Sequence, residues 1–323
     1  MKRLMRDLAV LLAAALLTFG LDRLGTFSAL AAMLEMAVPA GTEAESPSLW
    51  PGESAAYIPP APTPPAAPAA AATGTAEDLV AALSQGDLRS ASSFAVDQLD
   101  LLREGWSYTI PAEGPQVLIF HTHSCEAYAP RGEDDYEPSG EFRTLDEGQS
   151  VIAVGDELTA ALEAMGFQVL HDRSLYDYPA YNGAYDRSGA AVRQLLEANP
   201  SIRVVVDLHR DSLGGRRTEY LLPDGTTSAQ VMLLLTTGEN GLYHPSWREN
   251  LKLGLELQNR MELDYPGLAR PLYLSPARYN QHLSPGALLI EVGTDANTLA
   301  EAKQASLLFA DCLGKVLETH KEN

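Results

Sequence analysis

Two histidines and two glutamates in this chain have the types and the spacing needed to hold a metal ion beside a base. His123 and Glu126 form a His-x-x-Glu pair directly after one apolar run, His209 ends a second run, and Glu291 ends a third. A catalytic zinc ion takes three protein ligands and keeps a fourth position open for water or substrate. We therefore predict Zn²⁺ as the cofactor, held by His123, Glu126 and His209.

The remaining residue of this set, Glu291, is predicted to be the general base. Bound zinc lowers the pKa of water to about 7, so that a nearby carboxylate can take its proton at neutral pH. Glu291 would then return that proton to the leaving nitrogen of a cleaved amide. The predicted chemistry is metal-assisted hydrolysis of an amide bond.

Other ligand assignments stay open at this stage. His121 could replace His123, and Glu147, at the start of a predicted helix, could replace Glu126. In a purely structural interpretation, His209 is a core residue and the two glutamates are solvated or ion-paired. A His-x-x-Glu pair alone arises often by chance, but its combination with a His and a Glu at two other strand ends favours the metal site.

Three further polar residues are predicted to contact the substrate or to support the ligands: His121, Arg210 and Asn280. Arg210 would pair with a peptide carboxylate through two hydrogen bonds, or else form a salt bridge with Asp207 or Asp211. Asp207 could instead orient a histidine ligand. Asn280 stands in a polar loop before the last predicted strand.

Alternating strands and helices are predicted to position these side chains. Short β-branched and apolar runs predict strands at 117–120, 167–170, 202–208, 218–222, 231–236, 270–274 and 287–292. Apolar residues at helical spacing predict helices at 151–165, 189–198, 247–263 and 297–317. This order predicts an α/β fold with three layers, in which helices flank a mostly parallel sheet. Ligands collect beyond the carboxyl ends of parallel strands, where the candidate residues stand.

The N-terminal residues predict export and a membrane anchor. Lys2, Arg3 and Arg6 precede an apolar run over residues 8–21, which orients the N-terminus to the inside. A second apolar stretch follows, and we favour an uncleaved anchor over residues 1–39 rather than a cleaved signal peptide. The expected location is the cell membrane, with a single span and the catalytic domain outside the cytoplasm.

The rest of the chain divides by composition. Residues 40–76 are rich in Pro and Ala and predict a semi-rigid linker. Residues 77–110 predict a short helical lead-in, with helices at 76–83 and 90–102, and 111–323 predict the catalytic domain. The formal net charge of −20 argues against nucleic acid as a partner, and two cysteines do not make a disulfide framework.

Five segments of the chain resemble the stage II sporulation protein P family, over about residues 117–301. They are IFHTHSCEAY (119–128), YNGAYDRS (181–188), NPSIRVVVDLHRD (199–211), YNQHLSPG (279–286) and LIEVGTDANT (289–298). His209 and Glu291 match their motifs, and His123 with Glu126 matches the His-x-x-Glu form. Zinc amidases place this Glu at a helix start, which would point to Glu147. Cys125 departs from the Thr or Ser that the family often has there.

The resemblance implies the fold of zinc amidases, which is similar to that of zinc carboxypeptidases. It implies an N-acetylmuramoyl-L-alanine amidase, with endopeptidase activity on peptide cross-links, that remodels septal peptidoglycan during sporulation engulfment. It also implies stage II sporulation proteins D and M as partners.

Two other functions compete with this one. The first is a non-catalytic wall-binding or scaffold protein that descends from an enzyme. The second is a zinc carboxypeptidase-like peptidase, which would cut free peptide ends. A complete set of metal ligands and a base favours an active enzyme over a non-catalytic descendant of one.

Overall fold

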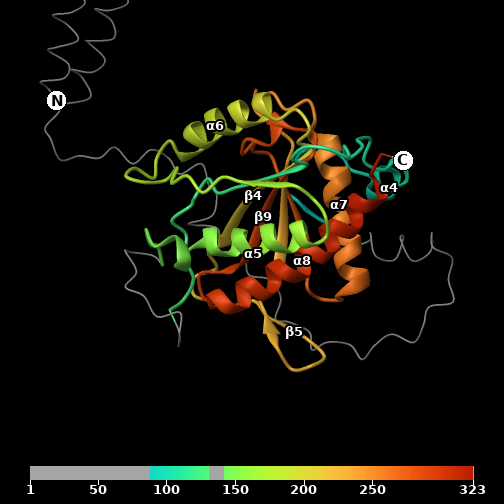
Figure 1. Ribbon diagram of the computed structural model, residues 1–323. Helices are drawn as coiled ribbons and strands as arrows, with labels where there is room; N and C mark the ends of the chain where they lie inside the picture. Colours follow the sequence, from blue (N-terminus) through green and yellow to red (C-terminus); the bar gives the residue numbers. More distant parts are fainter. Residues whose placement is uncertain (1–87, 131–141, 323) are drawn as a thin grey trace, which may run out of the picture. The chain divides into compact units, whose positions relative to one another are not determined.

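A seven-stranded sheet forms the centre of the structure, a computed structural model that describes residues 88–130 and 142–322 (Figure 1). The strand order is β1-β8-β7-β9-β4-β2-β3. The strands are β1 (Leu88–Ser90), β2 (Val117–Phe120), β3 (Val169–His171), β4 (Val204–Asp211), β7 (Val231–Thr236), β8 (Leu272–Ser275) and β9 (Ala287–Thr294). A separate two-stranded ribbon pairs β5 (Tyr220–Leu221) with β6 (Thr227–Ser228).

The sheet is mostly parallel, with one reversal of direction. Strands β3, β2, β4 and β9 run parallel to one another, and so do β1, β8 and β7. The two groups meet at the antiparallel pair β7–β9. The carboxyl ends of β2, β4 and β9 therefore share one edge with the amino ends of β7 and β8.

Helices cover both faces of the sheet, which confirms the predicted three-layer α/β fold. The helices are α4 (Gln98–Glu104), α5 (Val151–Ala164), α6 (Ala184–Ala198), α7 (Trp247–Asp264) and α8 (Leu299–Thr319), with short 3₁₀ turns η2 (Glu147–Gln149) and η3 (Gln281–Leu283). Helix α6 lies on the face opposite α5, α7 and α8 (Figure 1).

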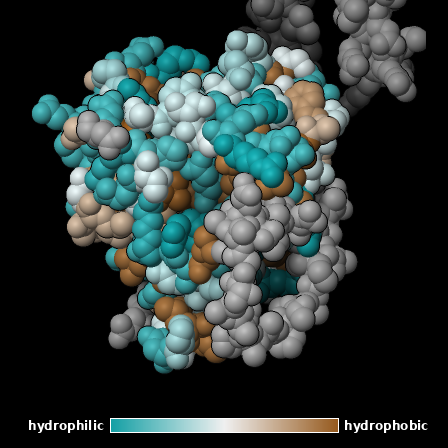
Figure 2. All heavy atoms as spheres, turned by 90° about the vertical axis from the view of Figure 1, so that its right-hand side faces the viewer, coloured by the Kyte–Doolittle hydropathy of each residue, from teal (hydrophilic) through white to brown (hydrophobic). Residues whose placement is uncertain are grey.

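Alternation along β2 shows how one strand serves two cores. Val117 and Ile119 pack into the large core with α5, α7 and α8, whereas Leu118 and Phe120 pack into the small core under α6. The side chain of Leu158 in α5 is fully buried in the large core, so its truncation to Ala would cost about 2–5 kcal/mol. On the side shown in Figure 2, hydrophobic residues lie among hydrophilic ones, the usual mixture at a protein surface.

Side-chain caps define where two of the helices near the site begin. The hydroxyl of Ser150 accepts a hydrogen bond from the backbone N–H of Ile152 and starts α5. Thr298 and Glu301 form a reciprocal capping box at the start of α8. Because β9 ends at Thr294, this cap turns the chain back within a few residues of the strand that carries Glu291.

Several elements differ from the sequence-based expectation. Residues 88–104 contribute strand β1, which pairs with β8, and helix α4 in place of a helix at 90–102. Helix α6 begins at Ala184, five residues earlier than predicted, and β4 extends to Asp211. The predicted anchor (1–39) and linker (40–76) lie outside the described residues. Within 88–130 and 142–322, no helix is long and apolar enough to cross a membrane.

Candidate metal centre

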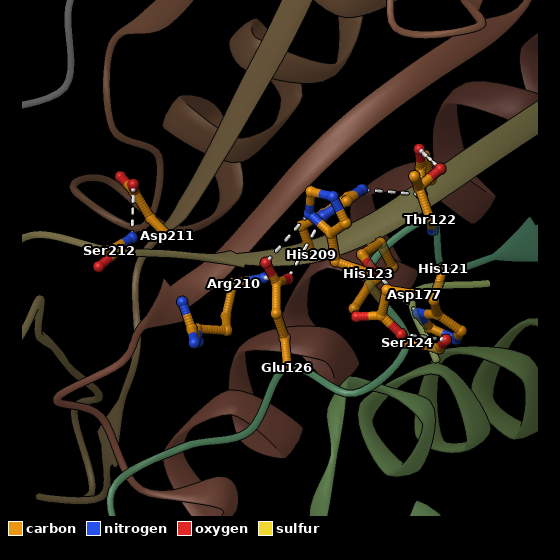
Figure 3. A network of polar contacts seen from close by, with 12 residues as sticks. His121, Thr122, His123, Ser124, Glu126, Asp177, His209, Arg210, Asp211 and Ser212 are labelled. Carbon is orange, nitrogen blue, oxygen red and sulfur yellow. Dashed lines mark hydrogen bonds and ion pairs between the residues drawn. The ribbon is translucent and has the colours of Figure 1, made fainter. Parts of the chain in front are cut away.

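His123, Glu126 and His209 converge at the carboxyl ends of β2 and β4 (Figure 3). The Nδ1 atom of His123 lies 3.4 Å from Oε1 of Glu126, and the Nδ1 atom of His209 lies 3.3 Å from Oε2 of the same carboxylate. The three donor atoms lie within 4.8 Å of one another. Glu126 and His209 are buried and His123 is partly exposed, so one side of the cluster is accessible.

The His-x-x-Glu turn is held in place by a buried carboxylate. Asp177, whose side chain is 0% exposed, accepts hydrogen bonds from the hydroxyl of Ser124 (3.0 Å) and the backbone N–H of Cys125 (3.2 Å). It also forms an ion pair with Arg143. The backbone N–H of Glu126 closes the turn on the carbonyl of His123 at 3.0 Å. Together these contacts direct both side chains of the pair toward β4.

Asp207 lies behind His209 and faces its second nitrogen. Its Oδ1 atom is 2.9 Å from Nε2 of His209, an ion-pair distance, although the alignment is not that of a hydrogen bond. The backbone N–H and the hydroxyl of Thr122 donate to the two oxygens of Asp207 at 2.8 and 2.7 Å. A carboxylate in this place keeps the proton of the imidazole on Nε2, which leaves Nδ1 free to bind a cation.

Glu291 lies beside His209 on the adjacent strand. The two residues are register partners in the parallel pair β4–β9, so both side chains project from the same face of the sheet. Glu291 is 3% exposed, and its Oε2 atom has no hydrogen-bond partner among the described residues. Burial, assisted by the carboxylate of Asp211, raises the pKa of Glu291 to about 8, against the opposing effect of His209.

Charge interactions hold the side chains of the His123, Glu126 and His209 cluster together. Burial alone would raise the pKa of Glu126, but His209, His123 and Arg210 outweigh it and hold this pKa well below its usual range. Burial would lower the pKa of His209, but the carboxylates of Asp207 and Glu126 raise it well above its usual range. A cation placed between these groups would replace the proton of His209 as the positive charge that they stabilise.

The two alternative ligands have other partners. His121 is fully buried, with Nδ1 at 2.8 Å from the carbonyl of Leu208 and Nε2 at 2.9 Å from Nε2 of His171. Glu147 forms an ion pair with Arg173 at 2.9 Å. Neither residue belongs to the group of donor atoms around Glu126.

Arg210 and Asn280 connect segments around the site. The guanidinium of Arg210 donates to the carbonyl of Ala127 at 3.0 Å, and its backbone N–H donates to Oε2 of Glu126 at 3.2 Å. The amide of Asn280 donates to the carbonyl of Tyr185 (2.8 Å) and contacts the hydroxyl of Ser188 (3.1 Å). These contacts fix the turn after Glu126 to β4 and the loop before β9 to α6.

Three neighbours of the site were not singled out from sequence. Tyr181 stacks on His123, with ring centroids 4.5 Å apart, and Tyr185 lies over His209 at 6.5 Å. Arg270 forms a buried ion pair with Asp211 at 2.8 Å. The segment 181–188 was one of the matching motifs, so both tyrosines carried a signal without an assigned role. Arg270 carried no such signal. It stands at the amino end of β8, and the sequence does not show that this end meets the carboxyl ends of β4 and β9.

The donor set fits a divalent metal ion. Two imidazole nitrogens and a carboxylate, with donor atoms within 4.8 Å of one another, form the kind of ligand set that catalytic zinc sites use. The Oε2 atom of Glu291, buried on the strand beside His209 and without a hydrogen-bond partner in the described part of the chain, is a further polar atom that a substrate or water could satisfy. Fold and site together define an α/β protein with a candidate centre for a divalent metal ion.

Comparison with known proteins places the chain in a family. The model of the stage II sporulation protein P family matches residues 71–314, and the chain belongs to this family. It is 30% identical over 213 residues to stage II sporulation protein P of Bacillus subtilis (strain 168). That match covers 62% of this chain, and the chain spans about half (50%) the length of that relative.

Solved structures of similar arrangement are distant. They include N-acetylmuramoyl-L-alanine amidase AmiC2 of Nostoc punctiforme (TM-score 0.38, 13% identity, 64% of this chain and 98% of that one). They also include the amidase Ami1 from Mycobacterium smegmatis (0.38, 13%, 66% and 98%). A third is the CwlD amidase from Clostridioides difficile, in complex with the GerS lipoprotein (0.38, 14%, 63% and 99%). Family membership and the geometry of the metal centre, rather than this distant likeness, are the basis for a function.

Proposed function

We propose that this chain is a zinc-dependent peptidoglycan hydrolase of sporulation that cleaves the amide between N-acetylmuramic acid and L-alanine. The observation that carries the proposal is the arrangement of His123, Glu126 and His209 around one point, with the buried carboxylate of Glu291 on the adjacent strand. Membership in the stage II sporulation protein P family supports the cell wall as substrate.

His123, Glu126 and His209 would hold the ion, and each has a support for that role. Asp177 fixes the turn that carries the first two, and Asp207 faces the outer nitrogen of His209. When bound, zinc supplies a Lewis acid that polarises the amide carbonyl and lowers the pKa of water.

Glu291 would move the proton. During hydrolysis the water oxygen forms a bond to the carbonyl carbon while its proton passes to the carboxylate of Glu291. The carbon–nitrogen bond then breaks, and Glu291 delivers the same proton to the leaving nitrogen, so that it ends the cycle ionised. In the metal-free protein, burial and the carboxylate of Asp211 raise the pKa of Glu291. A bound cation would lower this pKa again, toward the ionised form that accepts a proton.

The location and the partners extend the same proposal. The basic and apolar residues 1–39 would anchor the chain in the cell membrane, with the catalytic domain outside the cytoplasm. The linker would then allow the catalytic domain to reach peptidoglycan. Stage II sporulation proteins D and M, which the family resemblance implies, are the proposed protein partners.

The test compares the wild-type chain with Glu291→Gln, which keeps the shape of the side chain and removes its basicity. Metal content and the products released from purified sacculi are measured for both, with Glu157→Gln as a control, since Glu157 lies on α5 and pairs with Lys303. We expect one zinc ion per chain in all three proteins and no product from Glu291→Gln. Mass spectrometry should show free L-alanyl peptides, whereas products trimmed at free peptide ends would favour the carboxypeptidase alternative. Full activity of Glu291→Gln would show that Glu291 is not the base.

A further inference from the structure

Tyr181 occupies the partly exposed side of the metal centre. Its ring stacks on the ring of His123, with centroids 4.5 Å apart and an interplanar angle of 25°. Its hydroxyl lies 3.5 Å from Nδ1 of His123, the nitrogen that faces Glu126. Tyr181 is 51% exposed, so a polymeric substrate can reach it.

The position of the ring is fixed by a second contact. The guanidinium of Arg143 lies over the ring of Tyr181, 5.0 Å from its centroid. Arg143 in turn forms an ion pair with the buried carboxylate of Asp177, which also holds the His-x-x-Glu turn. The tyrosine ring is therefore attached to the same framework as the ligands.

The hydroxyl of Tyr181 is poorly placed to bond to His123 itself. The lone pair of Nδ1 lies in the plane of the imidazole and is directed toward Glu126, whereas a stacked hydroxyl lies above that plane. A distance of 3.5 Å in this geometry makes at most a weak hydrogen bond. When Nδ1 of His123 coordinates an ion, it can no longer accept a hydrogen bond. The hydroxyl of Tyr181 is then available to donate a hydrogen bond to a group outside the ligand set.

We propose that Tyr181 is a catalytic residue whose hydroxyl donates a hydrogen bond to the carbonyl oxygen of the scissile amide as that oxygen gains negative charge. The inference rests on the proposed hydrolase function. The base and the donor stand beside different ligands, Glu291 next to His209 and Tyr181 next to His123. A substrate carbonyl placed between them has its attacking water on the side of Glu291 and its oxygen on the side of Tyr181. An ordinary tyrosine keeps its proton at neutral pH and can serve as this donor.

The experiment uses the full zinc-loaded chain and the variant Tyr181→Phe, which keeps the ring and removes only the hydroxyl. Tyr178→Phe is the control, because Tyr178 is also exposed and lies three residues away. With soluble muropeptides we expect kcat of Tyr181→Phe to fall by about 10²–10³-fold, the usual effect of removing one donor to an oxyanion. KM, zinc content and the activity of Tyr178→Phe should stay close to wild type.

Binding of a tetrahedral mimic provides a readout that is independent of turnover. A phosphinate analogue of the muramyl–alanine amide should bind Tyr181→Phe more weakly by a similar factor, whereas binding of an uncleaved substrate to chains that also carry Glu291→Gln should not change. If the wild type is active and Tyr181→Phe has the same kcat, the role of Tyr181 is wrong while the hydrolase function stands. Loss of zinc from Tyr181→Phe would likewise contradict only the role of Tyr181. A zinc-loaded wild-type chain that releases no product would overturn the hydrolase function and this inference together.

Discussion

Glu291→Gln in the metal-free chain tests the environment of the proposed base without any assay of activity. The folded protein keeps a proton on Glu291 up to a pH of about 8, whereas the unfolded chain releases it near 4.5. The folded state therefore binds more protons between these values, and the free energy of unfolding of the wild type should fall as pH rises from about 4.5 to about 8. Gln at the same position has no such titration.

The magnitude follows from the difference between the two pKa values. At about 1.36 kcal/mol per pH unit, the change from 4.5 to about 8 sets a ceiling of about 5 kcal/mol. Water that reaches the carboxylate would reduce this value, but Glu291 is only 3% exposed, so we expect at least about 2 kcal/mol.

The assay is urea unfolding in a chelator at pH 5, 6.5 and 8.5. A buried Gln has unmet hydrogen bonds of its own at every pH, so the measured quantity is how the difference between variant and wild type changes with pH. We expect Glu291→Gln to gain stability relative to the wild type as pH rises, with no such trend in Glu157→Gln. Parallel curves for Glu291→Gln and the wild type would refute the assignment of a buried carboxyl with a raised pKa.

Three other predictions address the supports of the site and the core. Asp207→Asn should weaken zinc affinity by about 10–100-fold in a competitive chelator titration, because a neutral amide holds Nε2 of His209 less firmly; unchanged affinity would separate Asp207 from the metal centre. Arg270→Ala should lower the free energy of unfolding by about 3–5 kcal/mol in urea, because it leaves Asp211 buried without its cation, and a loss below about 1 kcal/mol would contradict a buried pair. His244 is 5% exposed, neither of its ring nitrogens has a hydrogen-bond partner within 88–130 and 142–322, and burial lowers its pKa to about 4. The wild type should therefore lose up to about 3 kcal/mol of stability as pH falls from about 6.5 to 4, and His244→Phe should reduce this loss in acid unfolding curves.

Strong local patterns were enough to predict most elements of the fold. The bounds of β2 and β7 match the predicted 117–120 and 231–236, because each is a dense apolar run with a polar or turn-forming residue at either end. Strand β1 was missed because three residues carry no period, and its register with β8 joins Leu88 to Leu272 across most of the described chain. Only the assembled sheet shows that pairing.

The site could be predicted in outline because parallel strands bring their carboxyl ends to one edge. His209, expected just beyond a strand at 202–208, lies inside the longer strand β4, whereas Glu291 lies inside β9, in agreement with the strand predicted at 287–292. The two residues are direct register partners. The choice between Glu126 and Glu147 could not be made from spacing, since it depends on the direction of a turn that Asp177, far along the chain, holds in place. In the structure Glu147 faces Arg173 instead.

The surroundings of the Glu291 carboxylate depend on topology in a way that no local pattern reveals. The reversal at β7–β9 places the amino end of β8 at the edge where β4 and β9 finish, and so brings Arg270 to Asp211. The two side chains then act on Glu291 in opposite directions, since Asp211 raises its pKa and Arg270 lowers it. Were β7 and β8 parallel to β9, Arg270 would lie at the far edge, and its opposition to burial and Asp211 at Glu291 would be lost. The direction of these two strands is therefore part of what sets the proton affinity of Glu291.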